Sequence, residues 1–455
     1  MSAAARALGD WRWTLVALVL GVGVVAQFVT VGGDWDWLVA MGDHVRRTGA
    51  VPDDVPFAVA DTGGWHDVPV LAQLLASALH DLGARAVVVA HLLATCVALA
   101  VLAATARARG ASDAAVAGAV AAVVLGSLST LGVVRAQTFS LVPFAVLLAL
   151  LVRQHRRPDR GIWWAVPLVA VWGNLHGAVL MGVCVLGAYL VVDRLPRRPL
   201  ETVVVGAASL LALCATPQLW STPAYYLAVL RNVSAERHEG LWARPSPGSP
   251  FDVLMLLAGL ALLVVVLRRR RPLWEYVAVA GLCLATASAA RHGVWLLFLL
   301  AVLVPAPRPG GDRPRGPDVV RGAVAVGLVA VVVAVPVALL RGPAVLGASP
   351  AVVARVAEVV RAEGSASVLA PAPLSEALAV SGARLWAGNP LDAFGAADQA
   401  AFLDFIDGDD GGRVAVGRAD LVVVEDGSRP EALVRDDPAF EPRPCGDGWT
   451  CYVRR

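Results

Sequence analysis

Two aspartates set between tryptophans are the first residues whose types and spacing suggest chemistry. The stretch from Gly33 to Trp37 reads Gly-Asp-Trp-Asp-Trp and directly follows the first long apolar run. Ionised groups at the edge of a membrane are costly to hold unless they are used, and a carboxylate there can take the proton of an attacking hydroxyl. Asp34 is therefore the first candidate for a catalytic carboxylate and Asp36 the second. The structural alternative is that both cap the helix predicted over Leu38 to Thr48.

Four basic side chains, Arg135, His176, Arg291 and His292, are candidates for holding a departing phosphate. Arginine is favoured because its planar guanidinium binds phosphate through two parallel hydrogen bonds. Arg135 and Arg291 could instead be long side chains that reach outward from the ends of apolar helices. Asn174 and His176 interrupt an apolar stretch, where polar residues often only hydrogen-bond a neighbouring helix. Both are kept as candidate site residues.

The remaining candidates lie in two polar segments. Trp37, Trp65 and His66 belong to the segment that Asp34 opens. Glu236 and Glu239 lie one helical turn apart and could hold a divalent cation together with Asp34, because hard cations take carboxylate oxygens. A solvated helix end is the alternative interpretation of these two glutamates. The six cysteines lack the Cys/His clustering of zinc or iron sites, so a structural metal is not expected, and a divalent cation is the one cofactor considered.

The composition indicates that these residues are positioned by membrane-spanning helices. The 455 residues are 57% hydrophobic and 16% charged, whereas soluble domains carry about 25% charged residues. Apolar runs predict about eleven spans, several shorter than the usual ~20 residues. They are Trp13 to Val31, Ala84 to Ala106, Ala114 to Leu131, Ala136 to Val152, Ile162 to Gly173, Ala178 to Val192, Thr202 to Thr216, Phe251 to Leu267, Leu273 to Ala289, Val294 to Val304 and Val319 to Leu340.

The distribution of arginine predicts the orientation of these spans. If they alternate, the short loops rich in arginine all fall on the side of Arg6 and Arg12, which the positive-inside rule makes the cytoplasm. These loops contain Arg107 and Arg109, Arg153 to Arg160, Arg194 to Arg198, Arg268 to Arg271 and Arg308 to Arg315. Arg135 and Arg291 then lie on the outer face together with Asp34, His176, the loops 32–83 and 217–250, and the tail.

The tail, residues 343–455, has mixed charge and no spanning run, which predicts a small α/β domain outside the membrane. Strands are expected at Ser367 to Ala370, Arg384 to Ala387 and Leu421 to Glu425, with helices near Ser375 to Val380 and Ala396 to Ile406. A hairpin is expected over Phe440 to Val453. If Asp447-Gly448-Trp449 forms its turn, Cys445 and Cys451 lie opposite each other and can form a disulfide, which suits an oxidising exterior.

The order of short motifs resembles one family over nearly the whole chain. The motifs are Gly33-Asp34, Trp37, Gly42, Gly49, Pro52, Pro56-Phe57, Gly64-Trp65, Arg135-Ala136-Gln137, Asn174-Leu175-His176-Gly177, Thr216-Pro217 and Arg291-His292. In this order the chain resembles bacterial membrane proteins of the GT-C glycosyltransferase superfamily, in particular a branch with a soluble C-terminal domain. The resemblance implies a polyprenyl-phosphate-linked sugar as donor and an acidic residue of the first outer loop, here Asp34, as the base or acceptor-orienting group.

Together these patterns predict a polytopic GT-C-like protein, with a transmembrane domain over residues 1–342 and an extracytoplasmic α/β domain over 343–455. The predicted activity is transfer of a sugar from a polyprenyl-phosphate donor to a glycan, lipid or protein acceptor outside the bacterial plasma membrane. No nucleic-acid partner is expected, because the net charge is only +2. The alternatives are a transporter or flippase and a non-catalytic membrane scaffold. A transporter would carry ionisable residues near the midplane of its helices, whereas here they lie at the helix ends.

Overall fold

The computed structural model describes residues 10–304, 316–342, 344–345, 349–364 and 367–455. Arg6 and the arginines between 308 and 315 lie outside these residues. The chain divides into two compact units. The first unit contains residues 1–30, 83–215 and 241–343, and the second contains residues 31–82, 216–240 and 344–455. The first polar loop therefore belongs to the same compact unit as the C-terminal tail.

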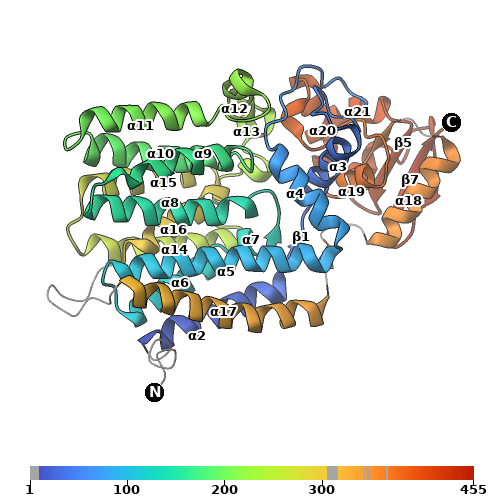
Figure 1. Ribbon diagram of the computed structural model, residues 1–455. Coiled ribbons are helices and arrows are strands. Elements are labelled where there is room, and N and C mark those ends of the chain that lie inside the picture. Colours follow the sequence, from blue (N-terminus) through green and yellow to red (C-terminus); the bar gives the residue numbers. More distant parts are fainter. Residues whose placement is uncertain (1–9, 305–315, 343, 346–348, 365–366) are drawn as a thin grey trace. The chain divides into compact units, whose positions relative to one another are not determined.

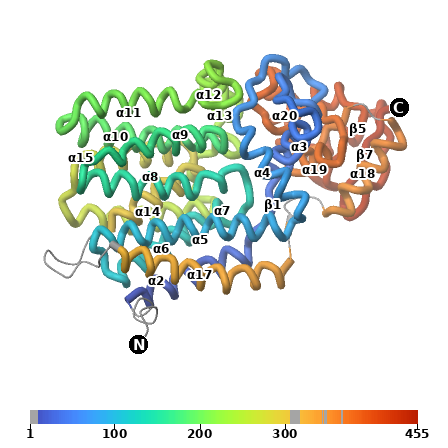
Figure 2. The backbone as a smooth tube through the Cα atoms, in the orientation of Figure 1, coloured from blue at the N-terminus to red at the C-terminus, as the bar shows by residue number. Residues whose placement is uncertain are grey.

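The first unit is a stack of apolar helices that lie side by side (Figures 1 and 2). Each predicted apolar run coincides with helical structure. The helices are α2 (Arg12–Phe28), α5 (Ala84–Ala108), α6 (Asp113–Gly126), α7 (Leu128–Leu131), α8 (Thr138–Arg156), α9 (Ala165–Gly173), α10 (Val179–Tyr189), α11 (Pro199–Ala212), α14 (Pro250–Leu267), α15 (Leu273–Ser288), α16 (Gly293–Val302) and α17 (Gly316–Arg341).

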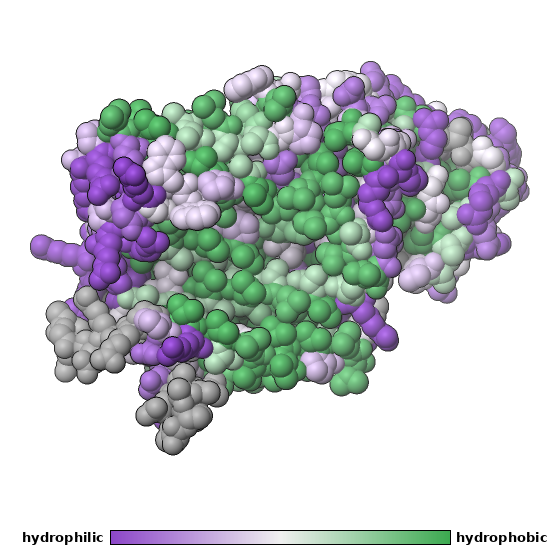
Figure 3. All heavy atoms as spheres, viewed as in Figure 1, coloured by the Kyte–Doolittle hydropathy of each residue, from purple (hydrophilic) through white to green (hydrophobic). Residues whose placement is uncertain are grey.

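Among the described residues of this unit, four helices are long and apolar enough to cross a membrane, judged by length and composition. They are α5, α8, α14 and α17 from Pro317 onward, and α2, α6, α11, α15 and the segment Ala290–Val302 are shorter apolar helices. Hydrophobic side chains cover much of the visible face of the stack (Figure 3). Hydrophilic side chains gather at the end where α10 leads into α11. An apolar helical protein is confirmed, and a total of eleven spans stays a prediction.

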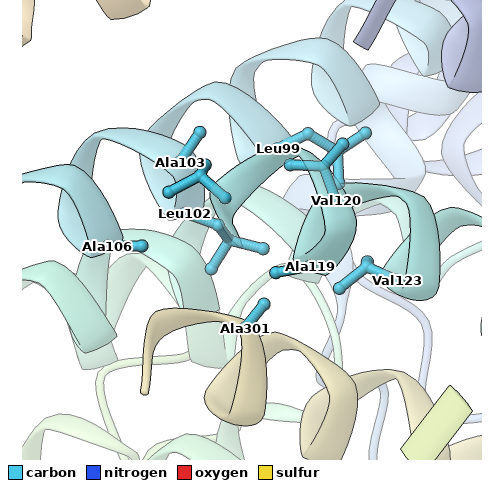
Figure 4. A pocket seen from close by; sticks show the side chains of 9 residues that line it. Leu99, Leu102, Ala103, Ala106, Ala119, Val120, Val123 and Ala301 are labelled. Carbon is cyan, nitrogen blue, oxygen red and sulfur yellow. The ribbon is translucent and has the colours of Figure 1, made fainter. Parts of the chain in front are cut away.

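Close packing of aromatic and small side chains holds the stack together. Phe144 lies 5.0 Å from Trp295 and 6.1 Å from Trp172 between ring centroids. At Gly182 an added Cβ would lie 2.3 Å from the Trp172 ring, so only glycine allows that approach. A small pocket in this unit has an entirely apolar lining that includes Leu99, Leu102, Val120 and Ala301 (Figure 4). Such a lining offers no group that could orient a polar substrate.

Arg194 and Arg109 form ion pairs and hydrogen bonds at the helix ends of the first unit. The fully buried Arg194 donates to Gln154 Oε1 at 2.9 Å and to Glu201 Oε2 at 2.9 Å. Arg109 Nη2 lies 2.8 Å from Oε1 of the buried Glu275. Buried charges are tolerated when they are paired, so we assign these residues to the structure of the stack.

The second unit is an α/β fold. Its mixed sheet has the order β4-β5-β7-β6, in which β4 (Val368–Leu369) pairs parallel to β5 (Leu421–Glu425). The strand β7 (Trp449–Arg454) runs antiparallel to both β5 and β6 (Phe440–Pro444). Its helices include α3 (Gly33–Thr48), α4 (Val70–Asp81), α12 (Thr222–Leu230), α13 (Val233–Arg237), α18 (Pro350–Glu363), α19 (Leu374–Val380), α20 (Ala396–Asp407) and α21 (Arg413–Gly417).

Most tail elements match their predicted positions, including the hairpin of β6 and β7. Cys445 and Cys451 form the expected disulfide, with Cα atoms 5.7 Å apart. The predicted strand Arg384 to Ala387 makes only isolated bridges, in which Leu385 pairs with Ala58 and Val368. The nitrogen of Leu385 donates to Phe57 O at 2.7 Å, and the nitrogen of Val59 donates to Leu385 O at 2.7 Å. The first loop thus supplies backbone hydrogen bonds to the edge of the tail domain.

One structural difference concerns the start of α3. The helix was expected from Leu38 but begins at Gly33, so Asp34 and Asp36 lie in its first turn. The N-cap residue is Gly32, and no side chain caps the helix. The capping role considered for the two aspartates is therefore wrong, although carboxylates in a first turn still interact favourably with the helix dipole.

Gly42 sets the distance between α3 and α4. A Cβ at this position would lie 2.1 Å from the backbone oxygen of Gln73 and 2.8 Å from Ser77 Cβ. Because a backbone carbonyl within a helix cannot move aside, Gly42→Ala is expected to destabilise the second unit by about 1–3 kcal/mol through overpacking. Thermal unfolding of the purified protein measures this effect. Gly395→Ala, where an added Cβ meets nothing within 4 Å, is the control.

Candidate functional site

The second unit carries the candidate catalytic carboxylates. Asp34 and Asp36 are both half-buried and lie in the first turn of α3. This turn packs closely on α19, since a Cβ at Gly33 would lie 2.6 Å from Pro373 Cβ and 3.2 Å from Glu376 Oε2. The glycine is what allows the start of α3 to reach α19. The two aspartates are thus held on a rigid helix and not on a mobile loop.

Glu376 is a third carboxyl group at this place, and the sequence analysis missed it. Its side chain is fully buried and accepts hydrogen bonds from Ser375 Oγ at 2.9 Å and Asn389 Nδ2 at 2.6 Å. Burial, and then the charge of Glu376, raise the pKa of Asp36 to about 7. Burial also raises the pKa of Glu376, with a smaller contribution from Asp34. In the sequence, Glu376 is only one acidic residue in a predicted helix, so nothing distinguished it.

Trp37 and Trp65 take part in a small hydrophobic cluster of the second unit. Trp37 packs against a small cluster of Met41, Val55 and Trp65. The Trp65 indole also donates from Nε1 to Asp392 Oδ2 at 3.1 Å. His66 is half-buried next to Trp65. The structure therefore gives the two tryptophans a role in packing.

A buried acid next to this cluster was also missed. Asp67 is fully buried, and its Oδ1 accepts from Gln73 Nε2 at 2.6 Å. Burial raises the pKa of Asp67 to about 7, with a smaller contribution from Asp392. The other two oxygens, Asp67 Oδ2 and Gln73 Oε1, are buried without a hydrogen-bond partner. A protonated Asp67 could donate to Gln73 Oε1 and satisfy both atoms.

Glu236 and Glu239 lie elsewhere in the second unit, in and just after α13. Arg237 of this helix pairs with Asp404 of α20 at 2.6 Å. Burial raises the pKa of Glu239, and Asp407 and Asp404 raise it further. Within the described ranges no three His, Cys, Asp or Glu side chains gather in a group that could hold a metal ion. The considered set of Glu236, Glu239 and Asp34 is therefore not assembled as a cation site.

The first unit gathers the four candidate phosphate-binding residues from three separate segments. Arg135 follows β2 (Val133–Val134), His176 lies between α9 and α10, and Arg291 and His292 lie in the short helix η5 (Ala290–His292). Burial and the neighbouring charges of Arg291, Arg135 and His292 lower the pKa of His176 to about 3. A neutral His176 therefore lies among three basic residues. This concentration of positive charge is suited to an anion.

Aromatic and polar neighbours fix this basic group. The Arg291 guanidinium carbon lies 3.7 Å from the centroid of the Trp242 ring, and Gln137 Nε2 donates to Arg291 O at 3.2 Å. His176 Nδ1 lies 3.0 Å from Ser140 Oγ, which also accepts from Trp172 Nε1 at 2.7 Å. The contact of Trp242 with Arg291 could not be read from sequence spacing.

Asn174 has a structural role in this arrangement. Its Nδ2 donates to Ala170 O at 2.8 Å, one turn earlier in the same helix, and to Ala215 O at 2.6 Å beyond the end of α11. These bonds close the ends of two neighbouring helices, as expected for a polar residue that interrupts an apolar stretch. Both amide hydrogens are occupied, so Asn174 fixes the turn that carries His176.

Comparison with known proteins identifies solved structures with a similar fold. No family model and no curated protein matches the chain. Among solved structures, the archaeal oligosaccharyltransferase AglB from Archaeoglobus fulgidus, in complex with an inhibitory peptide and a dolichol-phosphate, is 12% identical with a TM-score of 0.54. The alignment covers 97% of this chain and 74% of AglB.

Two further similar structures are of ArnT from Cupriavidus metallidurans. The apo form is 13% identical over 98% of both chains, with a TM-score of 0.49. The form bound to undecaprenyl phosphate is 14% identical over 97% of both chains, with a TM-score of 0.46. The chain has a GT-C-like fold, as its sequence motifs suggested.

Proposed function

We propose that the protein is a membrane glycosyltransferase that uses a polyprenyl-phosphate-linked sugar as donor and transfers it to an extracytoplasmic glycan, lipid or protein. The observation that carries this proposal is the grouping of Arg135, His176, Arg291 and His292 in the first unit. Arginine beside a neutral histidine suits a phosphate whose negative charge grows as the sugar departs. The dolichol-phosphate bound in AglB is a ligand of the same chemical class.

For the acceptor, we propose a carboxyl group of the second unit as the base. Asp34 is half-buried in the first turn of α3, where it can accept the proton of an acceptor hydroxyl. A sugar that passes through a cationic transition state needs both a base near the acceptor and positive charge near the leaving phosphate. We propose that the arginine-rich helix ends face the cytoplasm and that both groups act on the outer side of the bacterial plasma membrane.

Arg291 provides the direct test of the donor side. Arg291→Gln is expected to weaken binding of a polyprenyl phosphate by roughly 10–100-fold, because a charge-assisted hydrogen bond is worth about 1.5–3 kcal/mol. Binding is measured on the purified protein in detergent with a fluorescent polyprenyl phosphate. The corresponding polyprenol, which lacks the phosphate, is expected to bind equally weakly to wild type and variant.

The control variant is Arg321→Gln, since Arg321 is an exposed arginine on α17 of the same unit. It is expected to bind polyprenyl phosphate like the wild type. Equal binding by Arg291→Gln and Arg321→Gln would contradict the donor assignment. Movement of the lipid across vesicles without any sugar transfer would instead favour the flippase alternative.

A further inference from the structure

Glu376 is a buried carboxyl group that the proposed reaction does not yet use. None of its side chain is exposed, and its hydrogen bonds come from two neutral donors, Ser375 Oγ and Asn389 Nδ2. The neighbouring charge that acts on it is that of Asp34, which has the same sign. A buried carboxylate without an opposite charge nearby is energetically costly. We therefore expect Glu376 either to have a functional role or to carry a proton.

The backbone brings this group onto the first turn of α3. The absence of a side chain at Gly33 allows the approach, because a Cβ there would lie 3.2 Å from Glu376 Oε2. Asp34 follows Gly33 directly, and Asp36 lies in the same turn and is subject to the charge of Glu376. Three carboxyl groups from segments more than three hundred residues apart in sequence therefore share one small region of the second unit.

Carboxyl groups this close in a poorly solvated place cannot all be ionised at low cost, and one proton is then held between two of them. Of the three, Glu376 is fully buried, and Asp36 lies three residues after Gly33, on the face of α3 that Glu376 approaches. We propose that Glu376 is a positioning residue that shares one proton with Asp36, so that Asp34 is the carboxylate that receives the acceptor's proton. The role of Asp34 rests on the proposed function, whereas the proton sharing concerns the second unit alone.

Few other titratable groups lie on the helices that pack against α3 and α19. The helix α4, which packs along α3, has His80 and Asp81 as its only titratable residues, both in its last turn. Asp81 pairs with Arg46, nearly three turns beyond Asp36 on α3. The charged residues of α18, which packs on α19, include Arg355 and Glu358, an exposed ion pair. The titration of Asp36 should therefore respond mainly to Glu376.

Infrared titration of the protein labelled with 13C-aspartate directly tests whether Asp36 and Glu376 share a proton. The signal of Asp36 is the protonated carboxyl band that disappears in Asp36→Asn. Glu376→Gln keeps an oxygen to accept from Asn389 and removes the charge. It is expected to move the Asp36 midpoint to lower pH by roughly one unit. Glu358→Gln, which neutralises the exposed glutamate of α18, is expected to leave that midpoint unchanged.

A reciprocal measurement tests the same proposal if the Glu376→Gln protein does not fold. With 13C-glutamate, Asp36→Asn is expected to lower the Glu376 midpoint, because the coupling between two sites is mutual. The pH profile of transfer should also change in Glu376→Gln and not in Glu358→Gln, which a purely structural role would not produce. If neither the Asp36 midpoint nor the Glu376 midpoint moves, the proposal that the two groups share a proton is overturned. A wild-type protein without transfer activity would contradict only the proposed function, since both titrations can still be read.

Discussion

Replacing Asp34 by asparagine is expected to lower the rate of sugar transfer by about 10²–10⁴-fold, the usual contribution of a positioned general base. Asparagine has nearly the same shape but cannot take the proton of the acceptor hydroxyl. Because Asp34 is half-buried and α3 is not capped by its side chain, the fold should tolerate the change. Transfer is measured in membranes supplied with polyprenyl-phosphate-linked sugars, by the polyprenyl phosphate released.

The matched control is Asp53→Asn, which neutralises an exposed aspartate in the same unit. It should transfer sugar at the wild-type rate, and both variants should unfold at the wild-type temperature. A folded Asp34→Asn protein that forms product at the normal rate would rule out the catalytic assignment. The binding of polyprenyl phosphate should stay unchanged in Asp34→Asn, because the variant keeps all four basic residues that we assign to the phosphate.

Replacing Asp67 by asparagine is expected to stabilise the protein above neutral pH. The pKa of Asp67 is raised from 3.8 to about 7 by burial. The unfolded chain therefore loses this proton at lower pH than the folded chain does. The wild type should become less stable as pH rises from about 4 to about 7, by roughly 4 kcal/mol if the whole shift is realised. The asparagine side chain would carry no charge, could accept from Gln73 Nε2 as Asp67 does, and could donate to Gln73 Oε1.

Thermal unfolding measured across this pH range tests the expectation. Asp67→Asn and wild type should unfold at similar temperatures at about pH 4, and the variant should unfold at the higher temperature at about pH 8. Asp54→Asn, at an exposed position of the same loop, should follow the wild type throughout. Gln73→Leu should destabilise at every pH, because it leaves Asp67 without its hydrogen-bond partner. Parallel curves for wild type and Asp67→Asn would exclude a titrating Asp67.

Local sequence patterns were sufficient to predict much of the secondary structure of this protein. Uninterrupted apolar runs predicted the helices of the first unit, because a helix satisfies its own backbone in an apolar environment and needs no distant partner. The positions of β5, α20 and the β6–β7 hairpin followed from short-range periodicity and turn residues, and the disulfide of Cys445 and Cys451 followed from that hairpin. Among the basic candidates, His176 was found because it interrupts an apolar stretch, and Arg135 and Arg291 because they fall on the predicted outer face.

Tertiary structure decided what these residues contact. Leu385 pairs with residues of the first loop more than three hundred positions away, which joins that loop to the tail in one unit. Glu376, Asp67 and Trp242 gained their importance only through burial and distant neighbours, namely the aspartates of α3, Gln73 and Arg291. The type of a residue and its spacing set what chemistry it can do. Its protonation and its partners depend on solvent exclusion and on long-range packing, which no local pattern encodes.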